Sequence, residues 1–231
     1  MERYSRQLML DEIGEAGQRK LSDAKVLIVG VGGLGSPIAT YLAGAGVGTI
    51  GLVDADVLSI SNLQRQVLYA ENQVGKPKVL CAKERLLSLN STISIKTYHC
   101  WLTEENAKDI ISEYDIVVDG TDNFDVRFVI SDECERQHKP FVYGAICGFE
   151  GQVSVLCNGK ATYRTLFPNE AETKAMPHPG KQVIGTTPAV VGSIEANQVL
   201  QLICNYGKPL IDRLWTIDLR TMDSFIIDLI F

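Results

Sequence analysis

The stretch that most constrains the fold is residues 25–56, which read KVLIVGVGGLGSPIATYLAGAGVGTIGLVDAD. It opens with a short apolar, β-branched run typical of a buried parallel strand. A G-x-G-x-x-G pattern follows, and its glycines are Gly30, Gly32, Gly33 and Gly35. Such a turn points backbone N–H groups and the positive end of the next helix at an anion. Asp54 ends a second apolar strand, where a carboxylate can accept hydrogen bonds from a ribose. The stretch therefore predicts a strand–helix–strand unit that binds a nucleotide.

The residues after this unit indicate which nucleotide is bound. The glycine pattern alone is typical of nicotinamide or flavin cofactors. Here, however, polar and cationic residues gather after the second strand, namely Asp54, Asp56, Asn62, Arg65, Gln66, Lys76 and Lys78. A hydride-transfer pocket has little use for several cations, whereas the phosphates of a triphosphate and a pyrophosphate leaving group call for Arg, Lys and a metal ion. We expect ATP, with a dehydrogenase as the alternative.

Composition limits the class of protein. At 231 residues and 45% apolar content, the chain can form one domain with one substantial core. No apolar run is long enough to cross a bilayer, and the charged N-terminus does not resemble a signal peptide, so we expect a cytoplasmic protein. The six cysteines show no Cys-x-x-Cys spacing, which favours buried free thiols. A net charge of −6 argues against a nucleic-acid coat.

The rest of the chain predicts an α/β, Rossmann-like fold with a mostly parallel sheet and antiparallel strands added in the C-terminal third. Strands are expected at residues 93–98, 116–119 and 141–145, a hairpin through residues 148–156, and a final antiparallel pair at 214–218 and 224–228. Helices are expected over residues 75–89, with Pro77 in the first turn, from a cap at Thr103 to about residue 111, and after Asp122 and Asn123 through residue 137. A last helix is expected from a cap at Thr187, with Pro188 at its first position, to Gly207.

A second group of polar residues follows the strand at 116–119, within VVDGTDNFDVR. Ligands of open α/β sheets lie beyond the carboxyl ends of the strands, so Asp119, Thr121, Asp122 and Asn123 should face the same crevice as the glycine turn. Asp122 or Asn123 could equally serve as the cap of the following helix.

The single domain, residues 1–231, divides into segments with different expected roles. Residues 1–23 form a helical arm broken at Gly14 and Gly17; its Arg3 and Arg6 share a helical face and, judged from the residues alone, fit an exposed basic turn. Residues 24–145 form the nucleotide-binding half. Residues 146–231 form the carrier-binding half, named for the partner implied below, and include a strap at 167–187 that is rich in Pro and Gly and is expected to be mobile.

An ordered set of motifs covering nearly the whole chain resembles the ThiF/MoeB/HesA family, the bacterial relatives of ubiquitin-activating enzymes. The motifs are RYSRQ at 3–7, GVGGLGS at 30–36, DADVLSISNLQRQ at 54–66, GKPK at 75–78 and VDGTDNF at 118–124. The resemblance implies an adenylyltransferase that uses ATP and Mg²⁺ to activate the C-terminal Gly-Gly carboxylate of a ubiquitin-like sulfur carrier protein. It also implies a homodimer, with no role for nucleic acid or membrane.

The resemblance also implies roles for single residues. Gly33 lies against the nucleotide and Asp54 on the ribose, while Ser61, Asn62 and Arg65 contact the nucleotide and its phosphates. Gln66 supports their loop, Lys78 binds phosphate, and Asp122, with Asn123 beside it, is the Mg²⁺ ligand. Arg6 matches an arginine that reaches the triphosphate from the neighbouring subunit. The expected catalytic set is Arg6, Arg65, Lys78 and Asp122.

This chemistry needs no nucleophilic side chain. A C-terminal carboxylate, with a pKa of roughly 3.5, is already ionised at neutral pH. The protein must therefore neutralise charge, align two anions and expel water. His99, His138 and His178 lie in no evident triad spacing, so we expect them to be core or surface residues.

Two departures from the family pattern refine the prediction. Many relatives hold a structural zinc through two Cys-x-x-Cys pairs, but this chain reads TYRT at 162–165 and VIGTTPAVVGS at 183–193 where these would fall, so we expect no zinc. Some relatives carry a cysteine in the strap that takes up the activated carrier, and residues 167–187 contain none. We expect adenylation without an obligatory thioester on this chain, although Cys147 lies near the crevice.

The leading hypothesis is adenylylation of a ThiS-like carrier in thiamine thiazole synthesis. The preference for thiamine comes from the zinc-less, shortened pattern, which is ThiF-like. The same reaction on a molybdopterin-synthase small subunit stays open, because nothing in the residues separates the two branches. Further alternatives are an NAD-dependent oxidoreductase, a nucleotide-binding scaffold without turnover, and an adenylyltransferase for a small-molecule or peptide carboxylate.

Overall fold

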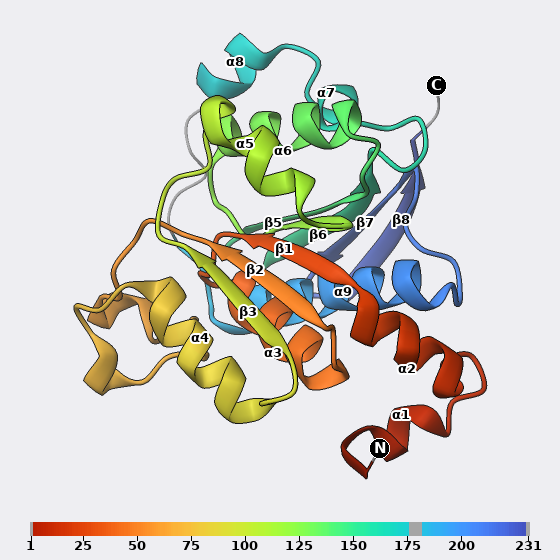
Figure 1. Ribbon diagram of the computed structural model, residues 1–231. Helices are drawn as coiled ribbons and strands as arrows, with labels where there is room; N and C mark the ends of the chain where they lie inside the picture. The colour runs from red at the N-terminus through yellow and green to blue at the C-terminus, as the bar shows by residue number, and fades with distance from the viewer. Residues whose placement is uncertain (1, 176–181, 230–231) are drawn as a thin grey trace.

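The computed structural model describes residues 2–175 and 182–229. A central sheet lies between two layers of helices, with a helical arm at its lower right in Figure 1. The strand order is β3-β2-β1-β4-β5-β6-β7-β8. Strands β1 to β5 pair in parallel, and β5 to β8 pair antiparallel. The predicted fold class is therefore confirmed.

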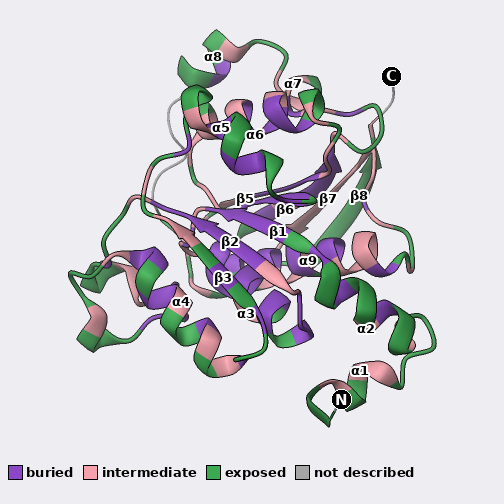
Figure 2. Cartoon of the chain, in the orientation of Figure 1, coloured by how far each residue is buried: buried purple, intermediate pink, exposed green. Residues whose placement is uncertain are grey.

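The strands fall close to the predicted positions. The parallel ones are β1 (Lys25–Val29), β2 (Thr49–Val53), β3 (Ser94–Tyr98), β4 (Ile116–Asp119) and β5 (Phe141–Cys147). The antiparallel ones are β6 (Glu150–Leu156), β7 (Arg213–Asp218) and β8 (Asp223–Asp228). In β1, every residue after the first is buried, because helices cover both faces of the parallel half. By contrast, all six residues of β8 are exposed, as the green strand in Figure 2 shows.

Two hydrophobic layers form on the two faces of the sheet. The lower layer packs Ile28, Leu52 and Val118 against helices below the sheet, and the upper layer packs Phe141 and Tyr143 against helices above it. The lower helices are α3 (Gly35–Ala45), α4 (Lys78–Leu89) and α9 (Thr186–Cys204). The upper helices are α5 (Glu104–Ser112), α6 (Phe124–Arg136), α7 (Tyr163–Leu166) and α8 (Glu170–Ala175).

The N-terminal arm comprises η1 (Glu2–Tyr4), α1 (Ser5–Leu8) and α2 (Gly14–Asp23). Gly14 has a φ of +50° and is the first residue of α2. The predicted break at Gly14 is therefore confirmed. The second predicted break is wrong, because Gly17 lies inside α2. A Cβ at Gly17 would stand 3.0 Å from Ile13 and 3.4 Å from the Cys204 sulfur, so a side chain would crowd its neighbours, while the backbone conformation of Gly17 does not require glycine.

Several predicted helix ends need correction. Pro77 is the N-cap residue of α4 and does not lie in its first turn. Gly185 is the N-cap residue of α9, so Thr187 does not cap it; the Thr187 hydroxyl instead donates to the Gly148 carbonyl at 2.9 Å. Asn205, at a φ of +59°, ends α9 before Gly207 is reached. Within the described parts of the chain, no helix has the length and apolar character needed to cross a bilayer.

The predicted strap, residues 167–187, contains a helix that the sequence pattern did not indicate. Helix α8 has six residues, too few to show a helical period, and acidic residues occupy its first turn. Its buried Thr173 donates a hydrogen bond to the Asn169 carbonyl. Residues 176–181 of the strap lie outside the described residues, and its mobility stays a prediction.

Candidate active site

The site lies at the carboxyl ends of β1 and β4, where the strand order reverses. Gly30 follows β1 with a φ of +85°, and Gly120 follows β4. A Cβ at Gly120 would stand 2.1 Å from the Gly30 carbonyl oxygen. A side chain at residue 120 would therefore prevent the turn after β4 from packing against the turn after β1. The glycine turn and the Asp122 loop are thus in backbone contact, and helix α3 begins at Gly35 with its N-terminus in the same crevice.

Asp54 lies under this turn and is largely buried. Its Oδ2 accepts from the Val31 N–H and its Oδ1 from the Asp56 N–H, both at 2.8 Å. Burial raises the pKa of Asp54, while Lys78 and the two backbone N–H groups oppose the rise. A carboxylate has about four acceptor positions, so two stay free for ribose hydroxyls. Asp54 therefore shapes the glycine turn in addition to its expected ribose contact.

Lys78 is buried at the start of α4, next to the site. Its Nζ lies 2.8 Å from Asp56 Oδ2, and its backbone N–H donates to the Asp56 carbonyl. The Lys78 side chain is 6% exposed and the Asp56 side chain 49%. The lysine therefore has a charge partner on its solvent side, and an arriving phosphate would compete with Asp56 for it.

The loop after β2 presents the SNLQRQ residues around η2 (Ile60–Asn62). Asn62 uses its Oδ1 to accept from the Ser59 N–H at 3.0 Å, which leaves its amide nitrogen for a ligand. Ser61 is exposed, and its carbonyl accepts from Arg65 Nη1 at 3.2 Å. Arg65 is half-buried and has no acidic partner among residues 2–175 and 182–229. A cation without a counter-charge, held beside the turn, suits an incoming phosphate.

Gln66 and Gly33 connect this loop to the glycine turn. Gln66 is buried, and its Nε2 lies 3.4 Å from where a Gly32 Cβ would be. Its Oε1 has no hydrogen-bond partner among the described residues. A Cβ at Gly33 would meet Pro188 of α9 at 3.3 Å and Arg65 at 3.6 Å. These contacts agree with Gln66 as a support of the loop and leave little room for a side chain at Gly33.

Asp122 and Asn123, adjacent in the sequence, differ in their bonding. Asn123 is the N-cap of α6, and its Oδ1 accepts from the backbone N–H groups of Asp125 and Val126 at 2.8 and 3.4 Å. The capping alternative thus holds for Asn123. Asp122 is exposed and makes no hydrogen bond or ion pair within the described parts of the chain. Its carboxylate is therefore available to a ligand.

Of the predicted site residues, Arg6 is the one that the fold does not bring to the crevice. Gln7, beside it in α1, donates to the Ala45 carbonyl at the C-terminal end of α3, at 2.9 Å. Helix α3 has 11 residues and is about 16 Å long, and its other end lies in the glycine turn. Arg6 is exposed at the far end of this helix. Its expected role at another subunit's site stays a prediction.

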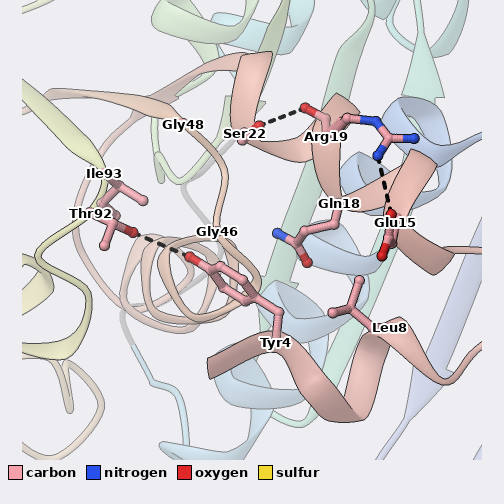
Figure 3. Close-up of a pocket in the computed structure, with 10 residues that line it drawn as sticks. All are labelled: Tyr4, Leu8, Glu15, Gln18, Arg19, Ser22, Gly46, Gly48, Thr92 and Ile93. Atoms are coloured by element: carbon pink, nitrogen blue, oxygen red, sulfur yellow. Dashed lines mark hydrogen bonds and ion pairs between the residues drawn. The ribbon is translucent and has the colours of Figure 1, made fainter. Parts of the chain in front are cut away.

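The arm also covers a cavity of about 340 Å³, shown in Figure 3. Tyr4 lies over Gly46 at the C-terminal end of α3, and its hydroxyl accepts from Asn90 Nδ2 at 2.9 Å. Gln18 and Thr92 line the same cavity. This hollow is at the opposite end of α3 from the glycine turn and is not the nucleotide site.

The residues present fit an Mg²⁺ ion only in part. Among the described residues, no group of three His, Cys, Asp or Glu side chains could hold a metal ion by itself. Mg²⁺ bound to nucleotides, however, takes one or two carboxylates, the phosphates and water. Asp122 supplies one free carboxylate just after the carboxyl end of β4. The other ligands of the ion would have to be phosphate oxygens and water, so the fit depends on a bound triphosphate.

Neither sequence segment that replaces a cysteine pair contains a metal ligand of that type. Tyr163 is buried, and Arg164 binds Asp132 through two 2.7 Å hydrogen bonds and Glu170 at 2.8 Å. Lys174 continues the chain of charges, with Glu170 at 2.7 Å and Asp125 at 2.8 Å. Ion pairs thus join α6, α7 and α8 in this region.

Cys147 is exposed at the end of β5, where the strap returns to the body. The Gly148 N–H donates to the Gln182 carbonyl at 3.1 Å, and Val183 forms a parallel bridge with Gly148. Gln64 approaches the Val183 carbonyl from the other side at 3.5 Å. The described end of the strap therefore lies between the nucleotide loop and the β5–β6 turn.

Sequence reasoning missed three residues that build this site. The Tyr69 hydroxyl donates to the Val31 carbonyl at 2.6 Å beneath the glycine turn. Arg127 makes a buried ion pair with Asp119. Glu195 of α9 is fully buried, and neither carboxylate oxygen has a partner among the described residues. The sequence carries no signal for them, because each appears in an ordinary apolar helix or loop pattern.

Taken together, the sheet order and the contact between the glycine turn and the Asp122 loop define a doubly wound α/β fold of the kind that binds nucleotides. A family model described as "ThiF family" matches residues 4–229, so the chain belongs to the ThiF family, as its motifs predicted. The predicted enzyme class is confirmed as well: proteins of this family catalyse adenylyl transfer, and the chain is an adenylyltransferase.

Individual relatives agree with the family. A sulfur carrier protein adenylyltransferase of Thermus thermophilus is 43% identical, over 94% of this chain and 83% of the relative. A probable molybdopterin-synthase adenylyltransferase of Porphyra purpurea is also 43% identical, over 90% of this chain. The chain spans 55% of that relative and 47% of the similar MOCS3-1 protein of Zea mays, about half the length of each.

Solved structures show the same fold. A crystal structure of E. coli MccB with ATP aligns with a TM-score of 0.85 at 26% identity, covering 99% of this chain and 72% of that one. A crystal structure of PaaA aligns with a TM-score of 0.83 at 23% identity and supports the fold alone.

Proposed function

We propose that this chain uses ATP to adenylylate the C-terminal Gly-Gly carboxylate of a ubiquitin-like sulfur carrier protein, and that it releases pyrophosphate. The observation that carries the proposal is the grouping at the strand-order reversal, where Asp122, without a partner among the described residues, and the cation Arg65 flank the glycine turn. The named activities of the Thermus and Porphyra relatives, and ATP in the MccB structure, support the same reading.

The reaction is a substitution at the α-phosphorus. A carboxylate oxygen of the carrier forms a bond to this phosphorus, and the bond to the oxygen bridging to the β-phosphate breaks. Pyrophosphate leaves with the electron pair, and no proton has to be moved, because the carboxylate is ionised at neutral pH. The residues therefore act on charge and orientation and not as general acids or bases.

Each named residue has a place in that task. The backbone N–H groups of the glycine turn and the α3 N-terminus face the phosphates. Arg65 and Lys78 supply positive charge, and Lys78 exchanges Asp56 for phosphate. Asp122 would hold Mg²⁺, which when bound neutralises phosphate charge. Asp54 and Asn62 offer their remaining acceptor and donor positions to the nucleoside.

We further propose that the carrier is ThiS-like and belongs to thiamine thiazole synthesis, with a molybdopterin-synthase small subunit as the second candidate. The basis for thiamine is the sequence pattern without cysteine pairs, while the relatives carry both kinds of name. We also propose a homodimer. Its basis is the position of Arg6, which lies too far along α3 to serve its own site.

ATP–pyrophosphate exchange with a panel of Gly-Gly-tailed carriers tests the proposal. Asp122→Ala and Arg65→Ala should each lose exchange by about 10²-fold or more, in line with the removal of one charge-stabilising group at a reacting centre. Wild-type rates in either variant would remove that residue from the mechanism. Absence of exchange with every carrier would favour a non-catalytic nucleotide scaffold or a small carboxylate substrate.

Mixed dimers test the role of Arg6. Arg6→Ala mixed with Asp122→Ala should recover part of the activity, because one of the two sites in the mixed dimer then has both groups. If mixed dimers form, as shown by two different affinity tags, and exchange stays absent, Arg6 does not act across the dimer.

A further inference from the structure

The loop that carries Asp122, residues 120–123, is held by two buried charged side chains. Arg127 of α6 donates from Nε to Asp119 Oδ2 at 2.6 Å, and from Nη2 to the carbonyls of Thr121 and Gly144 at 2.8 and 3.1 Å. Its side chain is 7% exposed and that of Asp119 0%. One guanidinium therefore joins β4, the loop, α6 and β5.

Asp119 holds the same loop from the other side. Its Oδ1 accepts from the Thr121 N–H at 2.8 Å and from the Thr121 hydroxyl at 2.7 Å. Gly120 donates to the Val29 carbonyl at 2.7 Å. Burial by itself lowers the pKa of Arg127, but the Asp119 carboxylate outweighs this and raises the pKa above its ordinary value, so the arginine stays charged.

One residue of this loop, Asp122, has a side chain without a hydrogen-bond partner among the described residues. Thr121 is bonded through its N–H, carbonyl and hydroxyl, and Asn123 is bonded as the α6 cap. Asp122 lies between them, and its side chain is exposed. Hydrogen bonds at Thr121 and Asn123 thus fix the backbone on both sides of Asp122, and they leave the Asp122 carboxylate free to bind a ligand.

We propose that Arg127 and Thr121 are positioning residues for Asp122, which orient its carboxylate toward the Mg²⁺–triphosphate. This inference rests on the proposed function. Mg²⁺ demands near-octahedral geometry with ligands at about 2.1 Å, so a loosened carboxylate loses much of its contribution. Misplacement of a catalytic group by about 1 Å can cost on the order of 10²-fold in rate.

The mildest probe is Thr121→Val, which keeps the β-branched shape and removes only the hydroxyl that donates to Asp119. Thr40→Val is its matched control, because the Thr40 hydroxyl donates at the same distance, 2.7 Å, to the Ser36 carbonyl within α3. ATP binding to the full chain is measured by calorimetry with and without MgCl₂. Because this measurement needs no carrier protein, it tests the role of Thr121 even if no carrier supports exchange.

We expect Mg²⁺ to tighten ATP binding in wild type and in Thr40→Val, and this gain to shrink by about threefold or more in Thr121→Val and to vanish in Asp122→Ala. ATP binding without Mg²⁺ should stay the same in wild type, Thr40→Val and Thr121→Val. The double variant Thr121→Val/Asp122→Ala should match Asp122→Ala, because Thr121 acts through Asp122.

Two outcomes would overturn the inference. One is a wild-type Mg²⁺ response in Thr121→Val, and the other is a loss in the double variant beyond that of Asp122→Ala. Arg127→Lys is a second test, because lysine keeps the charge but lacks the planar guanidinium whose Nε and Nη2 reach Asp119, Thr121 and Gly144 together. If folded Arg127→Lys has the full Mg²⁺ response, Arg127 does not position Asp122. Failure of exchange in wild type with an intact Mg²⁺ effect would instead count against the proposed function alone.

Discussion

The polar residues of the crevice fall into two regions that bond in opposite ways. A buried frame, defined as Asp54, Asp119 and Arg127, is held by backbone N–H groups, carbonyls and its own ion pair. An outer rim, defined as the exposed Ser61 and Asp122 and the half-buried Arg65, has few partners or none. Both regions come from the same short motifs. One motif therefore contains both the buried residues that hold the loops of the site and the outer residues that are free to contact a ligand.

The frame should dominate stability. Arg127→Met is expected to lower the free energy of unfolding by about 3–5 kcal/mol, because it leaves the Asp119 carboxylate buried and unpaired. Adding Asp119→Asn, which removes that charge, should recover part of the loss. Urea denaturation of the two single variants and the double variant measures this, and strictly additive losses would show that the pair is not coupled.

Asp54 gives a smaller effect of the same kind. Asp54→Ala leaves the Val31 and Asp56 N–H groups without their acceptor, which should cost about 1–3 kcal/mol. Asp122→Ala, a rim variant of identical chemistry, should change stability by less than about 0.5 kcal/mol. Comparable losses in the two variants, measured by thermal or urea denaturation, would erase the distinction between frame and rim.

Glu195, buried below β5, should make the free energy of unfolding depend on pH. A Cβ at Gly144 would stand 2.3 Å from its carboxyl carbon. Burial raises the pKa of Glu195 well above its ordinary value, Asp119 adds to the rise and Arg127 opposes it. The folded state therefore keeps a proton that the unfolded chain releases near pH 4.5, and this contribution to stability falls as pH rises above that value.

The slope from this one group is at most about 1.4 kcal/mol per pH unit. Glu195→Met has a similar length and no proton to lose, so its stability should fall less between pH 5 and 8 than that of wild type. The difference between variant and wild type should grow with pH. Parallel stability curves would show that Glu195 is not protonated in the fold.

The smallest effect is expected at the ion pairs that join α6, α7 and α8. The Arg164, Lys174 and Asp125 side chains are 40–64% exposed, so Lys174→Met should cost less than about 1 kcal/mol at low salt and nearly nothing at 1 M NaCl. Arg19→Met, which removes an exposed i,i+4 pair with Glu15, is the control. A salt-independent loss at Lys174 would point instead to the position of its Nζ over the Phe128 ring, 6.0 Å from the ring centroid.

Much of the fold and of the site could be predicted from local pattern. Apolar β-branched runs placed the strands, and the glycine spacing placed the first turn and helix, because period and backbone freedom are properties of short segments. The ordered motifs indicated the family, which the matching family model confirms. The roles of single site residues stay predictions that the geometry fits to different degrees.

What only the tertiary structure decided is which polar residue is buried and bonded. Asp119 and Asp122 belong to one motif, yet burial makes the first a partner of Arg127 and exposure leaves the second free. Likewise, Gly17 and Glu195 take their constraints from Cys204 and Gly144, which are far away in the chain. Sequence by itself determined the elements and their order, because these depend on neighbouring residues. Desolvation and charge pairing depend on contacts between distant segments, and these exist only after the sheet has assembled.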